Sequence, residues 1–173
     1  MRKKTSFKVY TVNRLLWRSL TQLLQRRQPP FDYVQPPALP DHLTSSRSPV
    51  FIRHLDCGSC NGCELELNAL INPVYDLEQY GIRFESSPRH APDWIAMTGP
   101  YTRNLDEAAR LTLAATPGAR ILAVGDCAID GAIFKESYAI MEHPSVIESA
   151  IVLKVAGCPP TPVEVLQVLL EHR

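Results

Sequence analysis

The sequence predicts an α/β protein with a parallel sheet, and three observations support this class. Short apolar segments typical of buried strands alternate with segments of helical periodicity from residue 50 onwards. Strand and helix candidates that alternate in this way are typical of a parallel sheet. Each cysteine or cysteine group directly follows a strand candidate, which is where open parallel sheets bind their ligands.

The expected strands cover residues 50–56, 82–86, 94–98, 120–125 and 150–156. The expected helices cover residues 64–80, with a break at Pro73, residues 104–116 and residues 161–172. Asn104 and Glu107 have the spacing of a capping box at the start of the second helix. The last helix has the clearest start, with Thr161 as N-cap, Pro162 at the first helical position and Glu164 at the third.

Two segments precede this α/β domain of residues 50–173. Residues 1–28 show apolar positions at near-helical spacing, and residues 1–31 carry eight Lys or Arg and no acid. We expect a basic amphipathic helix that docks on a membrane surface or an acidic partner, the alternative being a helix packed on its own domain. Residues 29–49 contain six prolines and are expected to form an extended linker.

Composition narrows the function classes. No apolar run approaches the ~20 residues that span a bilayer, and the basic N-terminus lacks the apolar core and cleavage site of a secretory signal. Five cysteines, an odd number, without such a signal argue against a disulfide framework. The basic segment has only Tyr10 and Trp17 as interleaved aromatics, so nucleic-acid binding is not expected.

The cysteines fall into three groups that a parallel sheet would bring to one edge. Cys57, Cys60 and Cys63 follow the first strand, Cys127 follows the fourth and Cys158 follows the fifth. Four thiolates suit either structural zinc or a 4Fe–4S cluster. Structural zinc usually closes on two Cys-x₂₋₄-Cys pairs, whereas two of these cysteines are isolated in glycine-containing loops. This spacing favours a cluster over zinc, and buried cysteines without a metal are a further alternative.

Five blocks of sequence resemble a known family when taken in order. They are Asp56-Cys-Gly-Ser-Cys-Asn-Gly-Cys-Glu-Leu-Glu66, Ser87-Pro-Arg-His-Ala91, Thr98-Gly-Pro100, Gly125-Asp-Cys-Ala128 and Gly157-Cys-Pro-Pro-Thr-Pro162. Over residues 50–173 they look like the small subunit of membrane-bound (group 4) NiFe-hydrogenases of the formate hydrogenlyase type. That family is homologous to the B-type subunit of NADH–quinone oxidoreductase, respiratory complex I.

The resemblance implies a flavodoxin-like sheet with helices on both faces and one 4Fe–4S cluster. The family's ligands fall on Cys60, Cys63, Cys127 and Cys158. Cys57 is then a spare thiol near the cluster, although spacing leaves open that it replaces Cys60.

Other positions are expected to act around such a cluster. Glu64 and Glu66 are candidates for a proton relay, with solvated first-turn glutamates as the alternative. Arg89 and His90 are candidates to face a catalytic subunit or line a quinone cavity, with plain surface polarity as the alternative. Relatives usually carry Gly-Gly after the third cysteine, where this chain has Gly131-Ala132, so the loop is expected to differ slightly.

The resemblance implies a peripheral subunit at the cytoplasmic face of the inner membrane that transfers electrons. Its partners would be a large NiFe subunit, a ferredoxin-like iron–sulfur subunit and integral membrane subunits. One alternative is a complex I-type subunit that reduces quinone. Complex I relatives use adjacent cysteines, so the spacing from Cys60 to Cys63 favours hydrogenase. The second alternative is a zinc-stabilised scaffold without redox chemistry.

Overall fold

The structure, a computed structural model, describes residues 48–87 and 91–173, which belong to one compact unit of the chain. The expected helix in residues 1–28 and nearly all of the expected linker lie outside these residues. Arg89 and His90 lie outside them as well.

Five parallel strands form the sheet, in the order β2-β1-β3-β4-β5. They are β1 (Val50–Asp56), β2 (Ile82–Phe84), β3 (Trp94–Thr98), β4 (Arg120–Val124) and β5 (Ile151–Val155). This is the flavodoxin-like strand order, in which the direction of winding reverses between β1 and β3. The flavodoxin-like prediction is confirmed, and all five strands lie within one or two residues of their expected bounds.

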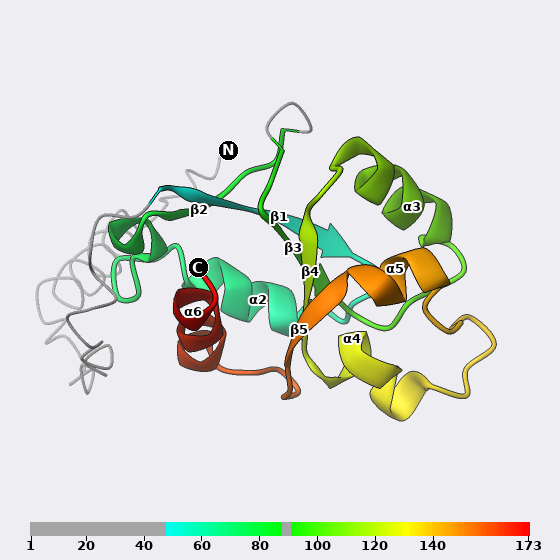
Figure 1. Cartoon of the computed structure of the whole chain (residues 1–173). Coiled ribbons are helices and arrows are strands. Elements are labelled where there is room, and N and C mark those ends of the chain that lie inside the picture. Colours follow the sequence, from blue (N-terminus) through cyan, green and yellow to red (C-terminus); the bar gives the residue numbers. More distant parts are fainter. Residues whose placement is uncertain (1–47, 88–90) are drawn as a thin grey trace, which may run out of the picture. The chain divides into compact units, whose positions relative to one another are not determined.

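Helices cover both faces of the sheet (Figure 1). The α-helices are α2 (Gly62–Ala69), α3 (Asp106–Ala115), α4 (Asp126–Asp130), α5 (Ser145–Ala150) and α6 (Pro162–Glu171), and the 3₁₀ turns are η2 (Leu77–Tyr80) and η3 (Ala132–Phe134). α2 and α6 lie on one face, and α3 and α5 lie on the other.

Alternation along the strands divides the core into two layers, because successive side chains point to opposite faces. Trp94 of β3 packs in the cluster that contains Leu67 of α2 and Leu166 of α6. Its neighbour Ile95 packs in the second cluster, with Ile147 of α5. The β3 strand is buried on both faces, which accounts for its continuous apolar sequence.

Of two predicted helix starts, one agrees with the structure and one does not. Thr161 caps α6 in a capping box with Glu164, as predicted. The predicted cap at Asn104 is wrong, because α3 begins at Asp106 and its N-cap residue is Leu105, without a side-chain cap. The backbone N–H of Arg103 donates to the Ala139 carbonyl, which holds this segment in a turn before the helix.

The break expected within residues 64–80 is present, since α2 ends at Ala69, before Pro73. The side chain of Asn72 accepts hydrogen bonds from the N–H groups of Val74 and Tyr75, at 2.8 and 3.2 Å, and so forms the turn that leads into η2. The short helices α4 and α5 were not predicted.

Candidate metal centre

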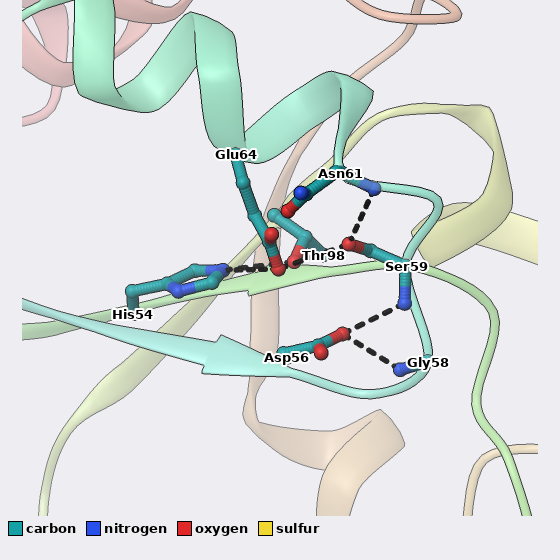
Figure 2. A network of polar contacts seen from close by, with 7 residues as sticks. All are labelled: His54, Asp56, Gly58, Ser59, Asn61, Glu64 and Thr98. Carbon is teal, nitrogen blue, oxygen red and sulfur yellow. Dashed lines mark hydrogen bonds and ion pairs between the residues drawn. The ribbon is translucent and has the colours of Figure 1, made fainter. Parts of the chain in front are cut away.

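The loop between β1 and α2 is shaped by a carboxylate. Oδ1 of Asp56 accepts hydrogen bonds from the backbone N–H of Gly58 at 2.8 Å and of Ser59 at 2.7 Å (Figure 2). These two bonds turn the chain as it leaves the carboxyl end of β1. Cys60, which follows directly, is exposed at this edge of the sheet.

Ser59 and Asn61 then set the start of α2. Asn61 has a left-handed backbone with φ of 77° and accepts the first bond of the helix from the N–H of Leu65. Its own N–H donates to the hydroxyl of Ser59 at 3.1 Å. The turn places Cys63 in the first turn of α2, half-buried beneath the loop.

The loops after β4 and β5 are hydrogen-bonded to each other. The N–H of Asp126 donates to the Gly157 carbonyl at 2.9 Å, and Oδ1 of Asp126 accepts the N–H of Gly157 at 2.7 Å. Cys127 and Cys158 each lie one residue beyond this pair. A reciprocal pair 31 positions apart in sequence therefore brings the two isolated cysteines together.

The four predicted ligands lie close enough to influence one another electrostatically. Burial raises the pKa of Cys63, and with the neighbouring Cys60, Cys127 and Cys158 it brings that pKa to about 11. Burial is also the largest cause that raises the pKa of Cys127, and the neighbouring Cys158 and Cys60 raise it further. Cys63 and Cys127 therefore favour the protonated thiol in the metal-free protein, and a bound metal centre would favour the thiolate instead.

Glycine makes room for this arrangement. Gly125 precedes α4 with φ of 93°, and a Cβ added there would overlap the sulfur of Cys63. A Cβ added at Gly62 would lie 3.6 Å from the sulfur of Cys60 and 3.8 Å from the ring of Pro159. The sulfur of Cys63 thus lies against the loop that carries Cys127, and Gly62 lies near both the sulfur of Cys60 and the loop that carries Cys158.

Cys57 lies apart from these four cysteines. Its side chain is completely buried in the apolar layer that also holds Met97, Tyr101 and Ala109. Burial raises its pKa to about 12, with a smaller contribution from Asp56. The structure therefore places Cys57 in the core and Cys60 at the edge of the sheet.

The residue types at this edge of the sheet can be compared with those that a metal centre takes. Within residues 48–87 and 91–173, no three His, Cys, Asp or Glu side chains are grouped so that they could hold a metal ion. A 4Fe–4S cluster is bound by four cysteine thiolates, and Cys60, Cys63, Cys127 and Cys158 supply that number and kind of side chain.

A polar network joins the cysteine loop to β1 and β3 (Figure 2). The hydroxyl of Ser59 donates to Oε1 of Glu64 at 2.9 Å, and the same oxygen lies 3.6 Å from Nε2 of His54. Nε2 of His54 shares a hydrogen bond of 2.8 Å with the hydroxyl of the buried Thr98. Glu64 is part of the network and only 18% exposed, so it is not a solvated surface glutamate, whereas Glu66 is not part of it.

Sequence reasoning missed His54, Ser59 and Thr98 in this network. Only the Asp-x-Gly-Ser turn after β1 signalled part of it. The network borders a cavity of about 660 Å³ lined by Arg53, His54, Asp56, Glu64, Leu67, Asn68, Ile71, Phe84, Glu85 and Ser86.

The loop after Cys127 has alanine at the second position of the expected glycine pair, and φ is positive at both positions. Gly131 has φ of 85°, and Ala132 is also left-handed, with φ of 44°. The N–H of Ala132 donates to Oδ1 of Asp130 at 3.0 Å, which supports this turn. Ala132 therefore adopts a conformation that glycine would reach with less strain.

Fold and site together define a flavodoxin-like α/β subunit with a cysteine centre at the carboxyl ends of its strands. Residues 60–172 match the family described as NADH ubiquinone oxidoreductase, 20 kDa subunit, and the chain belongs to this family. The matched range includes the four clustered cysteines and begins after Cys57.

Three similar proteins are subunits of oxidoreductase complexes. A probable membrane-bound hydrogenase subunit, mbhJ, of Pyrococcus furiosus is 39% identical over 69% of this chain and 71% of its own. Formate hydrogenlyase subunit 7 of Escherichia coli is 37% identical over 67% of this chain and 45% of its own. The B-type subunit of NADH-quinone oxidoreductase from Desulfovibrio desulfuricans is 34% identical over 58% of this chain and 54% of its own.

Among solved structures, a chain of the membrane-bound sulfane sulfur reductase, an archaeal respiratory membrane complex, superposes with a TM-score of 0.58 at 27% identity. The superposition covers 72% of this chain and 70% of the reductase chain. The predicted kinship with group 4 hydrogenases and complex I is thus confirmed, and the chain is of the type that forms part of oxidoreductase complexes. In the part of the chain that the structure describes, no helix is both long and apolar enough to cross a bilayer.

Proposed function

We propose that this chain is the electron-transfer subunit of a membrane-associated hydrogenase complex and carries one 4Fe–4S cluster. The observation that carries the proposal is the convergence of three loops: hydrogen bonds between Asp126 and Gly157 join the loops of Cys127 and Cys158, and the sulfur of Cys63 lies against Gly125. When bound, such a cluster would accept and release one electron at a time. The chain presents no other concentration of thiols among its described residues.

The residues of the chain have distinct roles in this proposal. Cys60, Cys63, Cys127 and Cys158 would hold the cluster. Asp56, Ser59 and the Asp126–Gly157 pair position the three loops through the hydrogen bonds described above. Cys63 and Cys127 are half-buried, while Cys60 and Cys158 are exposed and would face a partner's redox centre.

Hydrogenase is the favoured complex and quinone reduction is the alternative. Two relatives with hydrogenase and hydrogenlyase names are 39% and 37% identical, against 34% for the complex I-type subunit, and the chain has Cys60 and Cys63 spaced by two residues rather than adjacent cysteines. A NiFe-type large subunit, a ferredoxin-like subunit and integral membrane subunits would be the partners. Hydrogen-dependent dye reduction by the purified complex tests the proposal. Quinone reduction without that activity would favour the complex I-type role instead.

A zinc-stabilised scaffold is the remaining alternative, and metal analysis separates it from the cluster. About four irons and four acid-labile sulfides per chain, with an EPR signal on reduction, support the cluster. One zinc per chain and no visible absorbance would establish the scaffold.

We assign the proton-relay role to Glu64 rather than Glu66. Glu64 connects Ser59 in the cysteine loop with His54 at the wall of the cavity, so it lies on a polar path from the cavity to the loop. In the assembled complex, Glu64→Gln should slow proton-coupled turnover while leaving the iron content unchanged. Equal loss of activity in Glu66→Gln would remove the basis for the choice.

The basic N-terminal segment supplies the proposed attachment to the membrane arm on the cytoplasmic face. This proposal rests on its charge, because eight bases without an acid complement an anionic surface. Deletion of residues 1–30 should move the subunit to the soluble fraction. Membrane association that persists after the deletion would refute it.

A further inference from the structure

A carboxylate lies between the two loops that carry Cys127 and Cys158. Asp126 directly precedes Cys127 at the start of α4, and Gly157 directly precedes Cys158. Because the N–H of Asp126 donates to the Gly157 carbonyl and Oδ1 of Asp126 accepts the Gly157 N–H at 2.7 Å, the side chain is fixed at the junction of the two loops. Its charge therefore lies beside two of the four proposed cluster ligands.

The described part of the chain holds this carboxylate without a neutralising base. Within residues 48–87 and 91–173, Asp126 takes part in no ion pair with Lys, Arg or His. Its partner is the backbone N–H of Gly157, which orients the carboxylate but carries no full charge. Asp126 is also half-buried, so water and salt screen its charge less than they screen that of an exposed side chain.

The field of this carboxylate reaches a proposed ligand. Burial is the main cause of the raised pKa of Cys127, and the neighbouring Cys158 and Cys60 come next. Asp126 and then Asp130 raise this pKa further. A thiol pKa raised by acids means that added negative charge at the sulfur is unfavourable. Reduction of a cluster bound through that sulfur would add negative charge in the same place.

We propose that the carboxylate of Asp126 lowers the reduction potential of the 4Fe–4S cluster that the four cysteines would hold. Each electron taken from a donor adds one negative charge to the cluster, and a fixed negative charge nearby disfavours that addition. The reduced cluster is then the stronger electron donor, which suits delivery of electrons to protons in the hydrogenase role. The inference rests on the proposed function, because it needs a cluster at this site.

The test is a redox titration of the chain, reconstituted anaerobically with iron and sulfide, with dithionite as reductant and the EPR signal as readout. Asp126→Asn removes the charge but keeps Oδ1 as acceptor for the Gly157 N–H. We expect the equilibrium constant for reduction to rise roughly three- to tenfold, which is roughly 30–60 mV for one electron. Iron content should stay at the wild-type level. An unchanged potential would overturn the proposal.

Asp93→Asn is the matched control. Asp93 also accepts a backbone N–H from another segment through its side chain, that of Phe51 at 2.8 Å. It directly precedes β3, at the amino ends of the strands and thus at the edge of the sheet opposite the cysteines. Removal of its charge should leave the potential at the wild-type value. A shift as large as that of Asp126→Asn would contradict a local effect.

Asp130→Asn grades the effect. Asp130 is exposed, and its Oδ1 accepts the N–H of Ala132 at 3.0 Å, a bond that Asn can also make. Because salt and water screen an exposed charge, this variant should raise the potential less than Asp126→Asn does, and its shift should shrink at high salt. A larger shift in Asp130→Asn would contradict the assignment to Asp126.

Metal analysis separates failure of this inference from failure of the proposed function. About four irons per chain with the same potential in wild type and Asp126→Asn overturns the role of Asp126 alone. Loss of iron in Asp126→Asn would show that the charge serves to position the loops, and this also overturns the inference alone. One zinc per wild-type chain, without an EPR signal on reduction, overturns both.

Discussion

The backbone of Gly125 lies against the sulfur of Cys63, so that any side chain at position 125 would occupy the place of that sulfur. The contact joins the loop after β4 to the first turn of α2. This contact is a second reason, besides the φ of 93° at Gly125, for glycine at the start of the loop that carries Cys127.

Gly125→Ala should reduce the iron that the protein retains after anaerobic reconstitution, because the added methyl group displaces Cys63. Gly118→Ala is the control: Gly118 also has a positive φ, of 86°, but an added Cβ meets nothing within 4 Å. Gly125 has ψ of 154°, in a region that is essentially open to glycine alone, so its substitution also carries the larger backbone strain. Equal iron content in the two variants would mean that the contact with Cys63 has no role.

Ala132→Gly should stabilise the protein, because glycine adopts a φ of 44° with less strain than alanine. We expect a gain of about 0.5–1 kcal/mol in the free energy of unfolding, measured by denaturant titration. Ala114→Gly, at an exposed position within α3, should instead cost about 1 kcal/mol. A loss of stability in Ala132→Gly would contradict the left-handed turn.

Ser59→Ala should loosen the turn between Cys60 and Cys63. The substitution removes the acceptor for the Asn61 N–H and the donor to Glu64. We expect the variant to lose iron to a chelator several-fold faster than the wild type, and the decay of the visible absorbance measures this rate. Ser149→Ala, which removes an exposed hydroxyl bonded to the Val146 carbonyl in α5, should leave the rate unchanged. Equal rates for Ser59→Ala and the wild type would show that this hydroxyl does not hold the turn.

Cys57 should be the slowest cysteine to react with an alkylating reagent in cluster-free protein. Burial holds its pKa at about 12, so the thiol stays protonated at mildly alkaline pH, whereas Cys60 and Cys158 are exposed. Peptide mass spectrometry reads the order of modification. Early modification of Cys57 would contradict its place in the core.

The same pKa shift predicts how folding stability depends on pH. In the unfolded chain Cys57 ionises near its ordinary value of 9.0, and in the folded chain only near about 12. The folded state therefore binds more protons in this interval, and stability falls as the pH rises through it. Cys57→Ala should flatten this part of the curve in denaturant titrations across alkaline pH. An unchanged slope would mean that burial of this thiol does not control it.

Much of the fold could be predicted because its signals are local. The strands are runs of buried apolar residues, and α6 begins with a capping box contained within four residues. The helices α4 and α5, of five and six residues, lack enough length to show a periodic pattern. α4 also depends on the bond between Asp126 and Gly157, a contact between distant positions that no local pattern reveals.

Spacing alone does not decide between Cys57 and Cys60, yet strand alternation bears on the choice. Leu55 and Cys57 pack in the same apolar layer, whereas His54 and Asp56 reach the polar network on the other side. Extending the alternation of β1 by one residue puts Cys57 in the core. The cavity bordered by His54 and Glu64 had no comparable signal, because its walls come from three separate segments.

Iron and acid-labile sulfide analysis of single variants decides whether Cys60, Cys63, Cys127 and Cys158 hold one cluster. We expect about four irons and four sulfides per chain for the wild type and for Cys57→Ala. We expect a marked loss for Cys127→Ala and for Cys60→Ala. Full iron content in Cys127→Ala, or loss of iron in Cys57→Ala while Cys60→Ala keeps it, would show that other residues hold the metal.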